Sequence, residues 1–259
     1  MRRLLAFTLA GLLAFFAAAA HAQIERAPSA VNLAGEQRMW SQRIAKLYSQ
    51  VGLNVLPSLA TSQLGVASTR FEGNLAALKP TVASSAAATQ AYERLTGEWQ
   101  GLKKALSVAI SRDAAEALAR QAEATLAAAE TLTRVLEDES KSVDSRLVNL
   151  ASRQRMLSQR IANNYLLRNW GVESAVVREN LESSVKDFSA GLATLSARKD
   201  NSAEIRRELE EVAQQWEWLQ ASLSVEGAGS YRLIVAESAD AILEATDRVT
   251  RLYEQQSRR

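Results

Sequence analysis

The chain is 259 residues long, with 31 lysine and arginine residues, 29 aspartate and glutamate residues, one histidine and no cysteine. The absence of cysteine excludes disulfides and thiol chemistry, and a single histidine excludes a metal site of the usual His/Cys type. The net charge of +2 is too small to indicate binding to nucleic acid.

The first 22 residues have the pattern of a signal peptide. Two arginines precede an apolar run, and the tripeptide Ala-His-Ala at 20–22 is a cleavage site of the A-x-A type. We therefore expect residues 1–22 to be removed and the mature chain to be periplasmic, with balanced charge and without a histidine for a catalytic triad. The alternative is that the apolar run is retained as an N-terminal membrane anchor.

The mature chain shows helical spacing of apolar residues almost throughout. We predict eight helices, at about residues 29–55, 58–78, 84–110, 113–140, 144–170, 174–197, 202–223 and 230–257. Pro80 is expected to close the second helix, and Asp113 with Glu116 forms a capping-box pattern at the start of the fourth. Gly227 and Gly229 mark the last turn. The pattern predicts an all-α fold of two tandem up-down four-helix bundles.

The two predicted bundles are copies of one sequence module. The stretch VNLAGEQRMWSQRIAKLY at 31–48 recurs as VNLASRQRMLSQRIANNY at 148–165, at an offset of 117 residues. The same offset aligns Phe71 with Phe188 and Trp99 with Trp216. We therefore predict two modules, and their boundaries are 23–141 and 142–259.

The joint between the modules allows two interpretations. Residues 113–170 contain neither glycine nor proline, so one continuous helix is possible. Against it stand the polar run at 137–142 and the repeat offset, which places Ser145 where the first module has the helix-starting Pro28. We favour a break or kink.

On a helical wheel the first helix has an apolar stripe, expected to face the core, and a second face of small residues around one arginine. The stripe consists of Leu33, Trp40, Ile44, Leu47 and Val51. The second face consists of Ala34, Arg38, Ser41 and Ala45, and in the other module of Ala151, Arg155, Ser158 and Ala162. Small residues let another helix approach closely, so we expect each guanidinium to lie in a confined cleft.

We interpret Arg38 and Arg155 as a candidate site for a small oxyanion. Two guanidinium groups about 7 Å apart at an effective dielectric near 20 repel by about 2.4 kcal/mol, and an anion between them replaces that repulsion with two bidentate interactions. Residues in a secondary role are Ser41, Gln42, Arg43, Ser158, Gln159 and Arg160. The alternative is that each arginine is solvated, or paired with Glu36 or with a carboxylate of a neighbouring helix.

The repeated stretch resembles the opening of the PilJ-type domain, the N-terminal sensor module of type IV pilus methyl-accepting chemotaxis transducers. It is also similar to the P box of nitrate/nitrite sensor histidine kinases. The resemblance rests on N-L-A-G-x-x-R-M-x-S-x-R, from which the second copy departs because Ser152 stands in the place of Gly35. It implies a periplasmic four-helix sensor bundle in which Arg38 and Arg155 bind nitrate at a two-fold interface between first helices.

These features predict an exported sensory or binding accessory protein for a small oxyanion, nitrate or nitrite first, without a cofactor. Receptors of this type have two membrane spans and an output region, neither of which is evident in this chain, so we expect a membrane-bound sensor or chemotaxis protein to transmit the signal. The alternative function is a ligand-free helical module that docks to such a receptor, to a type IV pilus component or to a second copy in a homodimer.

An enzyme is not expected, because the carboxylates occur at the spacing of a solvated helix face. The residues in question are Glu123, Glu130, Asp240 and Asp247. The sequence leaves open whether Arg38 meets Arg155 within one chain or each meets its own copy in a dimer.

Overall fold

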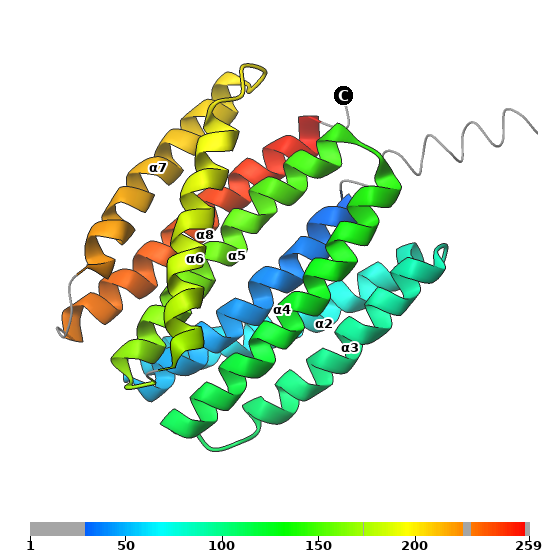
Figure 1. The fold of residues 1–259 in the computed structure, drawn as a ribbon. Helices are drawn as coiled ribbons and strands as arrows, with labels where there is room; N and C mark the ends of the chain where they lie inside the picture. Colours follow the sequence, from blue (N-terminus) through cyan, green and yellow to red (C-terminus); the bar gives the residue numbers. More distant parts are fainter. Residues whose placement is uncertain (1–28, 173, 225–228, 257–259) are drawn as a thin grey trace, which may run out of the picture.

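The computed structural model describes residues 29–172, 174–224 and 229–256, and these form eight helices and no strand (Figure 1). The first helix spans residues 29–52. The others are α2 (Pro57–Val82), α3 (Ala86–Leu106), α4 (Arg112–Ser140), α5 (Val143–Asn169), α6 (Ala175–Ser196), α7 (Ala203–Leu223) and α8 (Gly229–Gln256). The all-α prediction is confirmed, whereas the expected signal peptide and Gly227 lie outside the described residues.

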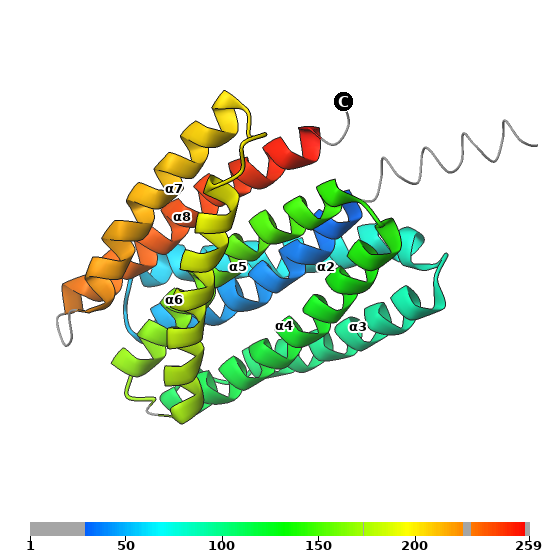
Figure 2. The same cartoon turned by 45° about the horizontal axis from the view of Figure 1, so that its top comes forward.

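The helices form two up-down bundles that lie side by side, the first from the first helix to α4 and the second from α5 to α8 (Figures 1 and 2). Each bundle has a buried aromatic pair at equivalent positions of the repeat. The ring centroids of Phe71 and Trp99 are 4.2 Å apart, and those of Phe188 and Trp216 are 4.3 Å apart. The prediction of two tandem four-helix bundles is confirmed.

The first helix and α5 lie next to each other at the centre of the molecule and run in the same direction (Figure 1). Their contacts advance together along both helices, from Gly35 against Ser152 to Ser49, whose hydroxyl donates to Asn163 Oδ1 at 3.2 Å. A Cβ at Gly35 would collide with Ser152 Oγ. The repeated small residues therefore allow the close approach that the sequence predicts, and they place it within one chain.

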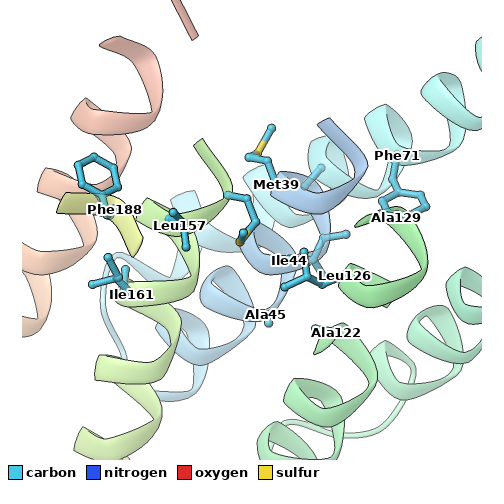
Figure 3. Packing of buried hydrophobic residues seen from close by; sticks show 14 of the residues in the cluster. Met39, Ile44, Ala45, Phe71, Ala122, Leu126, Ala129, Leu157, Ile161 and Phe188 are labelled. Carbon is cyan, nitrogen blue, oxygen red and sulfur yellow. The ribbon is translucent and has the colours of Figure 1, made fainter. Parts of the chain in front are cut away.

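This central position buries the first helix on both sides. Figure 3 shows Ile44 and Ala45 between Leu157 and Ile161 of α5 and Leu126 of α4. The stripe predicted to face the core is in fact its less buried part, because three of its five members, Leu33, Trp40 and Val51, are only half-buried. The face with Arg38 is the fully buried one, since the second bundle covers it.

Several predicted helix ends need correction. Pro80 does not close α2, which continues to Val82, because a proline in the last turn removes only one hydrogen bond. The third helix stops at Leu106, short of the predicted residue 110. The N-cap of α4 is Ser111, whose hydroxyl accepts from Ala114 N, so the predicted start at Asp113 was wrong.

The predicted break between the bundles is present. Helix α4 ends at Ser140, and Lys141 adopts a left-handed conformation with φ of 50°. Ser142 then caps α5 by accepting from the backbone N–H groups of Asp144 and Ser145. The turn lets α5 fold back beside the first helix. No helix in the described part of the chain is both long and apolar enough to cross a bilayer.

Candidate functional site

The structure brings Arg38 of the first helix and Arg155 of α5 together at the seam between the bundles. Their side chains are 0% and 1% exposed. Both guanidinium groups donate to Ser152 Oγ, Arg38 through Nη2 at 3.3 Å and Arg155 through Nη2 at 2.9 Å. The two arginines therefore meet within one chain, on either side of one hydroxyl.

Each arginine forms an ion pair with its own bundle. Arg38 Nη1 donates to Glu130 Oε2 of α4 at 2.6 Å, and Arg155 Nη1 donates to Asp247 Oδ1 of α8 at 2.6 Å. Glu130 and Asp247 are themselves 117 residues apart, so they are equivalent positions of the repeat. The carboxylates compensate the two buried cations, whose mutual repulsion would otherwise be costly.

Each arginine also reaches across the seam to the other bundle. Arg38 Nη2 donates to Asn149 Oδ1 at 2.7 Å, and Arg155 Nη2 donates to Asn32 Oδ1 at 2.6 Å. These asparagines are again equivalent positions of the repeat. The site therefore has approximate two-fold symmetry, with one carboxylate and one amide hydrogen-bonded to each guanidinium. Arg155 has a second ion-pair partner, since its Nη1 also lies 3.7 Å from Glu36 Oε1 of the first helix.

Ser152 breaks that symmetry, because its counterpart in the first helix is Gly35. The collision that a Cβ at Gly35 would make with Ser152 Oγ shows that the seam holds one side chain at this level and not two. The hydroxyl occupies the space between the guanidinium groups. Any guest at this point must displace it.

Burial and the neighbouring charges shift the pKa values of Arg38 and Glu130 in opposite directions. Burial lowers the pKa of Arg38 in spite of the attraction of Glu130. Burial alone would raise the pKa of the Glu130 carboxyl, but Arg38 and Arg153 outweigh that effect, and the net pKa is below its usual value. The lowered pKa keeps the Glu130 carboxyl ionised at neutral pH, opposite a guanidinium group, which is not deprotonated in proteins.

The ion pairs are open at their carboxylate end. The side chains of Glu130 and Asp247 are 39% and 29% exposed, whereas the arginines are enclosed. The Nε atoms of Arg38 and Arg155 are buried and make no hydrogen bond with the described residues. The Nε–H of each guanidinium is thus an unused donor, and the carboxylate partner can reach solvent.

The secondary candidates lie elsewhere. Ser41 and Ser158 donate to the carbonyls of Arg38 and Arg155, one turn back on the same helix. Gln42 donates to Ala122 O of α4 and Gln159 to Ala239 O of α8. None of these four side chains contacts a guanidinium group of Arg38 or Arg155 in the described hydrogen bonds, and they support the helix packing instead.

Arg43 and Arg160 link the two bundles. Arg43 Nη1 donates to Asp240 Oδ1 of α8 at 2.5 Å. Arg160 forms a two-pronged pair with Glu123 of α4, Nε to Oε1 at 2.9 Å and Nη2 to Oε2 at 2.6 Å. Each of these arginines therefore pairs with the carboxylate of the opposite bundle.

The interpretation of four carboxylates as an ordinary solvated face was wrong. Glu123, Glu130, Asp240 and Asp247 each pair with an arginine of the repeated helix. Their signal is in the sequence, because they fall into two couples separated by the repeat offset of 117 residues. The asparagines at 32 and 149 were missed as well, although they stand inside the repeated stretch.

The PilJ family model, described as the N-terminal part of type IV pili methyl-accepting chemotaxis transducers, matches the chain twice, at residues 19–125 and 139–252. The chain belongs to the PilJ family. The two PilJ matches correspond to the two bundles, and the family is one of sensory transducer modules of periplasmic type and not of enzymes. No curated protein and no solved structure matches the chain significantly.

Proposed function

We propose that the chain is an exported, periplasmic sensory accessory protein whose paired arginines bind a small planar oxyanion, with nitrate or nitrite the first candidates. The observation that carries the proposal is the convergence of two buried guanidinium groups, Arg38 and Arg155, on one point at the seam. Guanidinium is planar and matches planar oxyanions through paired donors. Membership of a family of transducer modules supports a sensory role.

The Nη atoms of both arginines already bond to oxygen atoms of the protein itself. Arg38 is bonded to a carboxylate oxygen of Glu130, the amide oxygen of Asn149 and the hydroxyl of Ser152. A planar anion would offer oxygen atoms to the same donors and to the unused Nε. Binding is therefore an exchange, in which the half-exposed carboxylate moves to solvent and the anion takes its place. Such competition makes the affinity weak, of order millimolar (about −4 kcal/mol).

The exchange also provides a signal. Glu130 and Asp247 tie α4 and α8 to the central helices, so their release changes how those outer helices pack. A membrane-bound sensor or chemotaxis protein in contact with α4 or α8 would read that change. Differential binding to the two packing states is the physical requirement for any such response.

A thermal unfolding experiment tests the proposal with the variant Glu130→Gln. Removing one partner of a buried ion pair leaves Arg38 uncompensated, so the melting temperature should fall by several degrees. Nitrate should restore part of that loss and raise the melting temperature more in the variant than in the wild type, because its intramolecular competitor is gone.

Glu116→Gln is the matched control, since among the described residues Glu116 forms an ion pair with Arg120 alone, an exposed residue on the same helix. It should respond to nitrate as the wild type does. If nitrate and nitrite at tens of millimolar leave both the wild type and Glu130→Gln unchanged relative to chloride, the anion proposal is refuted.

The second candidate function is a ligand-free interaction module. It is favoured by the carboxylates themselves, which already neutralise both arginines, and by Trp218 on α7, whose 71% exposure is unusual for so large an apolar side chain. In that case Trp218→Gln should abolish any self-association of the purified chain on size-exclusion chromatography. Nitrate should change nothing.

A further inference from the structure

The exposed large apolar side chains gather at one end of the molecule. This end, at the lower left of Figure 1, is where the first helix, α3, α5 and α7 end and where α2, α4, α6 and α8 begin. We call it the turn pole, and its described parts are the turns 53–56, 107–111 and 170–172 and the helix ends at Leu223 and Gly229. Nine large apolar side chains are exposed among the described residues, and the seven within two helical turns of this pole are Leu56, Leu59, Val108, Ile110, Val176, Trp218 and Ile234.

Contacts across the seam join the turns of the two bundles into one surface. Trp170, after α5, packs on Gly52 at the end of the first helix, where an added Cβ would lie 1.8 Å from the indole ring. Arg112, at the start of α4, reaches Gly171, whose own added Cβ would lie 3.9 Å from Arg112 Cδ. The turns therefore form a continuous end face that both bundles share.

The turn between α3 and α4 presents two apolar side chains on a backbone that is held in place. Val108 and Ile110 are 54% and 45% exposed. The hydroxyl of the buried Tyr48 donates to Ala109 O at 3.5 Å, and Val108 N donates to Ala105 O at 3.3 Å. Apolar side chains that a fixed backbone keeps in solvent indicate a contact surface.

The turn into α2 is uncharged as well as apolar. Residues 47–69 contain no charged residue, whereas their counterparts in the repeat, 164–186, contain six. Leu56 and Leu59 lie in this stretch and are exposed. Leu56 has φ of 47° and ψ of 53°, a left-handed conformation that bulky residues rarely adopt. The first bundle thus contributes an apolar, uncharged sector to the turn pole.

Basic residues surround the apolar side chains. The four terminal residues of the helices at the turn pole include six basic ones, Lys103, Lys104, Arg112, Arg168, Arg178 and Arg232. Asp113 is the one acidic residue at these described positions, and the glutamates at 173 and 226 in the sequence bring the net charge to +3. The helix ends and turns of the opposite pole hold six basic and seven acidic residues. Positive charge in excess is therefore a property of the turn pole alone.

This combination fits a lipid surface better than a protein. Two copies of the chain would repel each other through poles of the same charge. A helix of another protein would need a continuous apolar stripe or groove, whereas these side chains stand on separate turns. A lipid surface adapts to separate apolar side chains, and anionic headgroups attract the lysine and arginine residues around them.

We propose that the turn pole docks on the surface of a membrane that contains anionic phospholipid. Val108 and Ile110 enter the headgroup region, and the basic helix ends contact lipid phosphates. The contact is peripheral and places the helix axes at a steep angle to the membrane. It does not involve Arg38 or Arg155, so it is independent of oxyanion binding.

Co-sedimentation with vesicles tests the proposal. The mature chain of residues 23–259 is used, because the apolar leader would itself bind lipid, and it contains all the described helices. Vesicles of equimolar phosphatidylcholine and phosphatidylglycerol, at about 1 mM lipid and low salt, should carry down a large part of the protein. Phosphatidylcholine alone should bind about tenfold more weakly, and about 0.5 M NaCl should remove most of the binding.

The variant Val108→Asn/Ile110→Asn should weaken binding to the anionic vesicles by about tenfold, because two apolar side chains no longer enter the membrane. Both side chains are exposed, so the helix content should not change. Val143→Asn is the matched control, since Val143 is 63% exposed at the opposite pole, and it should bind like the wild type.

The variant Lys104→Gln/Arg178→Gln should also weaken binding by about tenfold and reduce its salt dependence. Its matched control is Arg146→Gln/Lys199→Gln, two exposed residues of the opposite pole, which should bind like the wild type. The proposal is overturned if anionic vesicles do not carry down the protein, if phosphatidylcholine binds it equally, or if variants at the two poles bind alike. It is also overturned if the apolar variant changes self-association on size exclusion and leaves vesicle binding intact.

Discussion

Lys46 is a cation that the structure places wholly inside the protein. Its side chain is 0% exposed, and its Nζ donates to Asp240 Oδ1 at 2.5 Å and to Ala236 O at 3.2 Å. Burial lowers its pKa from 10.5 to about 8 in spite of the attraction of Asp240. The second module has Asn163 at the equivalent position, so this charge is a feature of one side of the molecule only.

The lowered pKa of Lys46 predicts a pH effect on stability. Between pH 8 and 10.5 the unfolded chain binds more protons at Lys46 than the folded chain does. Lys46 therefore increases the free energy of unfolding as pH rises through that range. Below pH 8 the cost of burying the charge is fully present. The free energy of unfolding of Lys46→Met, taken relative to that of the wild type, should therefore be highest near pH 7. This difference should fall by on the order of 3 kcal/mol by pH 10.5.

Urea unfolding of both proteins across this pH range measures the difference directly. The comparison removes contributions that the two proteins share, such as that of Tyr253, whose pKa burial raises to about 12. Two parallel curves of unfolding free energy against pH would contradict the assignment of a strongly lowered pKa to Lys46.

At the residue scale the sequence predicted the arginines but not their partners. Arg38 and Arg155 were found because each stands alone among small residues in a stretch written twice. Glu130 and Asp247 stand among many other charges on long helices, and helical periodicity does not distinguish a carboxylate that faces an arginine from one that faces water. Only the repeat offset of 117 residues links the two. Which helix lies beside the arginine is decided by packing between distant segments.

At the scale of helices, Arg160 connects three elements. From α5 its guanidinium reaches Glu123 on α4, and Nη2 also donates to Asn180 Oδ1 of α6 at 2.8 Å. The side chains of Arg160 and Glu123 are 17% and 27% exposed. The pair is thus mostly enclosed and joins one bundle to the other.

We expect Arg160→Ala to lower the free energy of unfolding by about 2 to 3 kcal/mol, because it leaves Glu123 enclosed without its partner. Arg248→Ala is the matched control. Arg248 pairs with Glu208 and Glu211 of α7 within the second bundle, and its side chain is 36% exposed, so the loss should be below about 1 kcal/mol. Equal losses of unfolding free energy in the two variants, measured by urea unfolding, would show that the Arg160–Glu123 pair stabilises the protein no more than a pair within one bundle.

The helices themselves were the most predictable part, because amphipathic periodicity and capping residues act locally. Ser142, Ser174 and Ser202 each cap the helix that follows by accepting from its first turn. The errors occurred where two local signals competed. Both Ser111 and Asp113 are good caps, and only the backbone, extended at Ser111, decides between them.

At the scale of the whole molecule, the two bundles share a surface that neither can cover alone. The face of the first helix around Arg38 is buried by α5, and Ala34, Ser41 and Ala45 on that face are 0% exposed. The sequence predicted a tandem duplication but could not decide whether the two copies meet within one chain. The turn at Lys141 and Ser142 answers that question, since it is short and returns α5 beside the first helix.

Each half of the chain should therefore be unable to persist alone as a folded monomer. Residues 23–141 and 142–259, expressed separately, would expose a buried arginine face. We expect each half to form dimers or to lose helix, and an equimolar mixture to recover a 1:1 complex. Light scattering after size exclusion, with far-UV circular dichroism, measures both properties. Two stable, fully helical monomers would contradict the account.

The central claim is that the seam between Arg38 and Arg155 accepts a small oxyanion, and a calorimetric nitrate titration of the wild type beside Ser152→Gly tests it most directly. The substitution removes the hydroxyl between the guanidinium groups and gives the second module the residue of the first, Gly35. We predict weak binding in the wild type and about tenfold tighter binding in Ser152→Gly. The absence of nitrate binding in both proteins would contradict the claim.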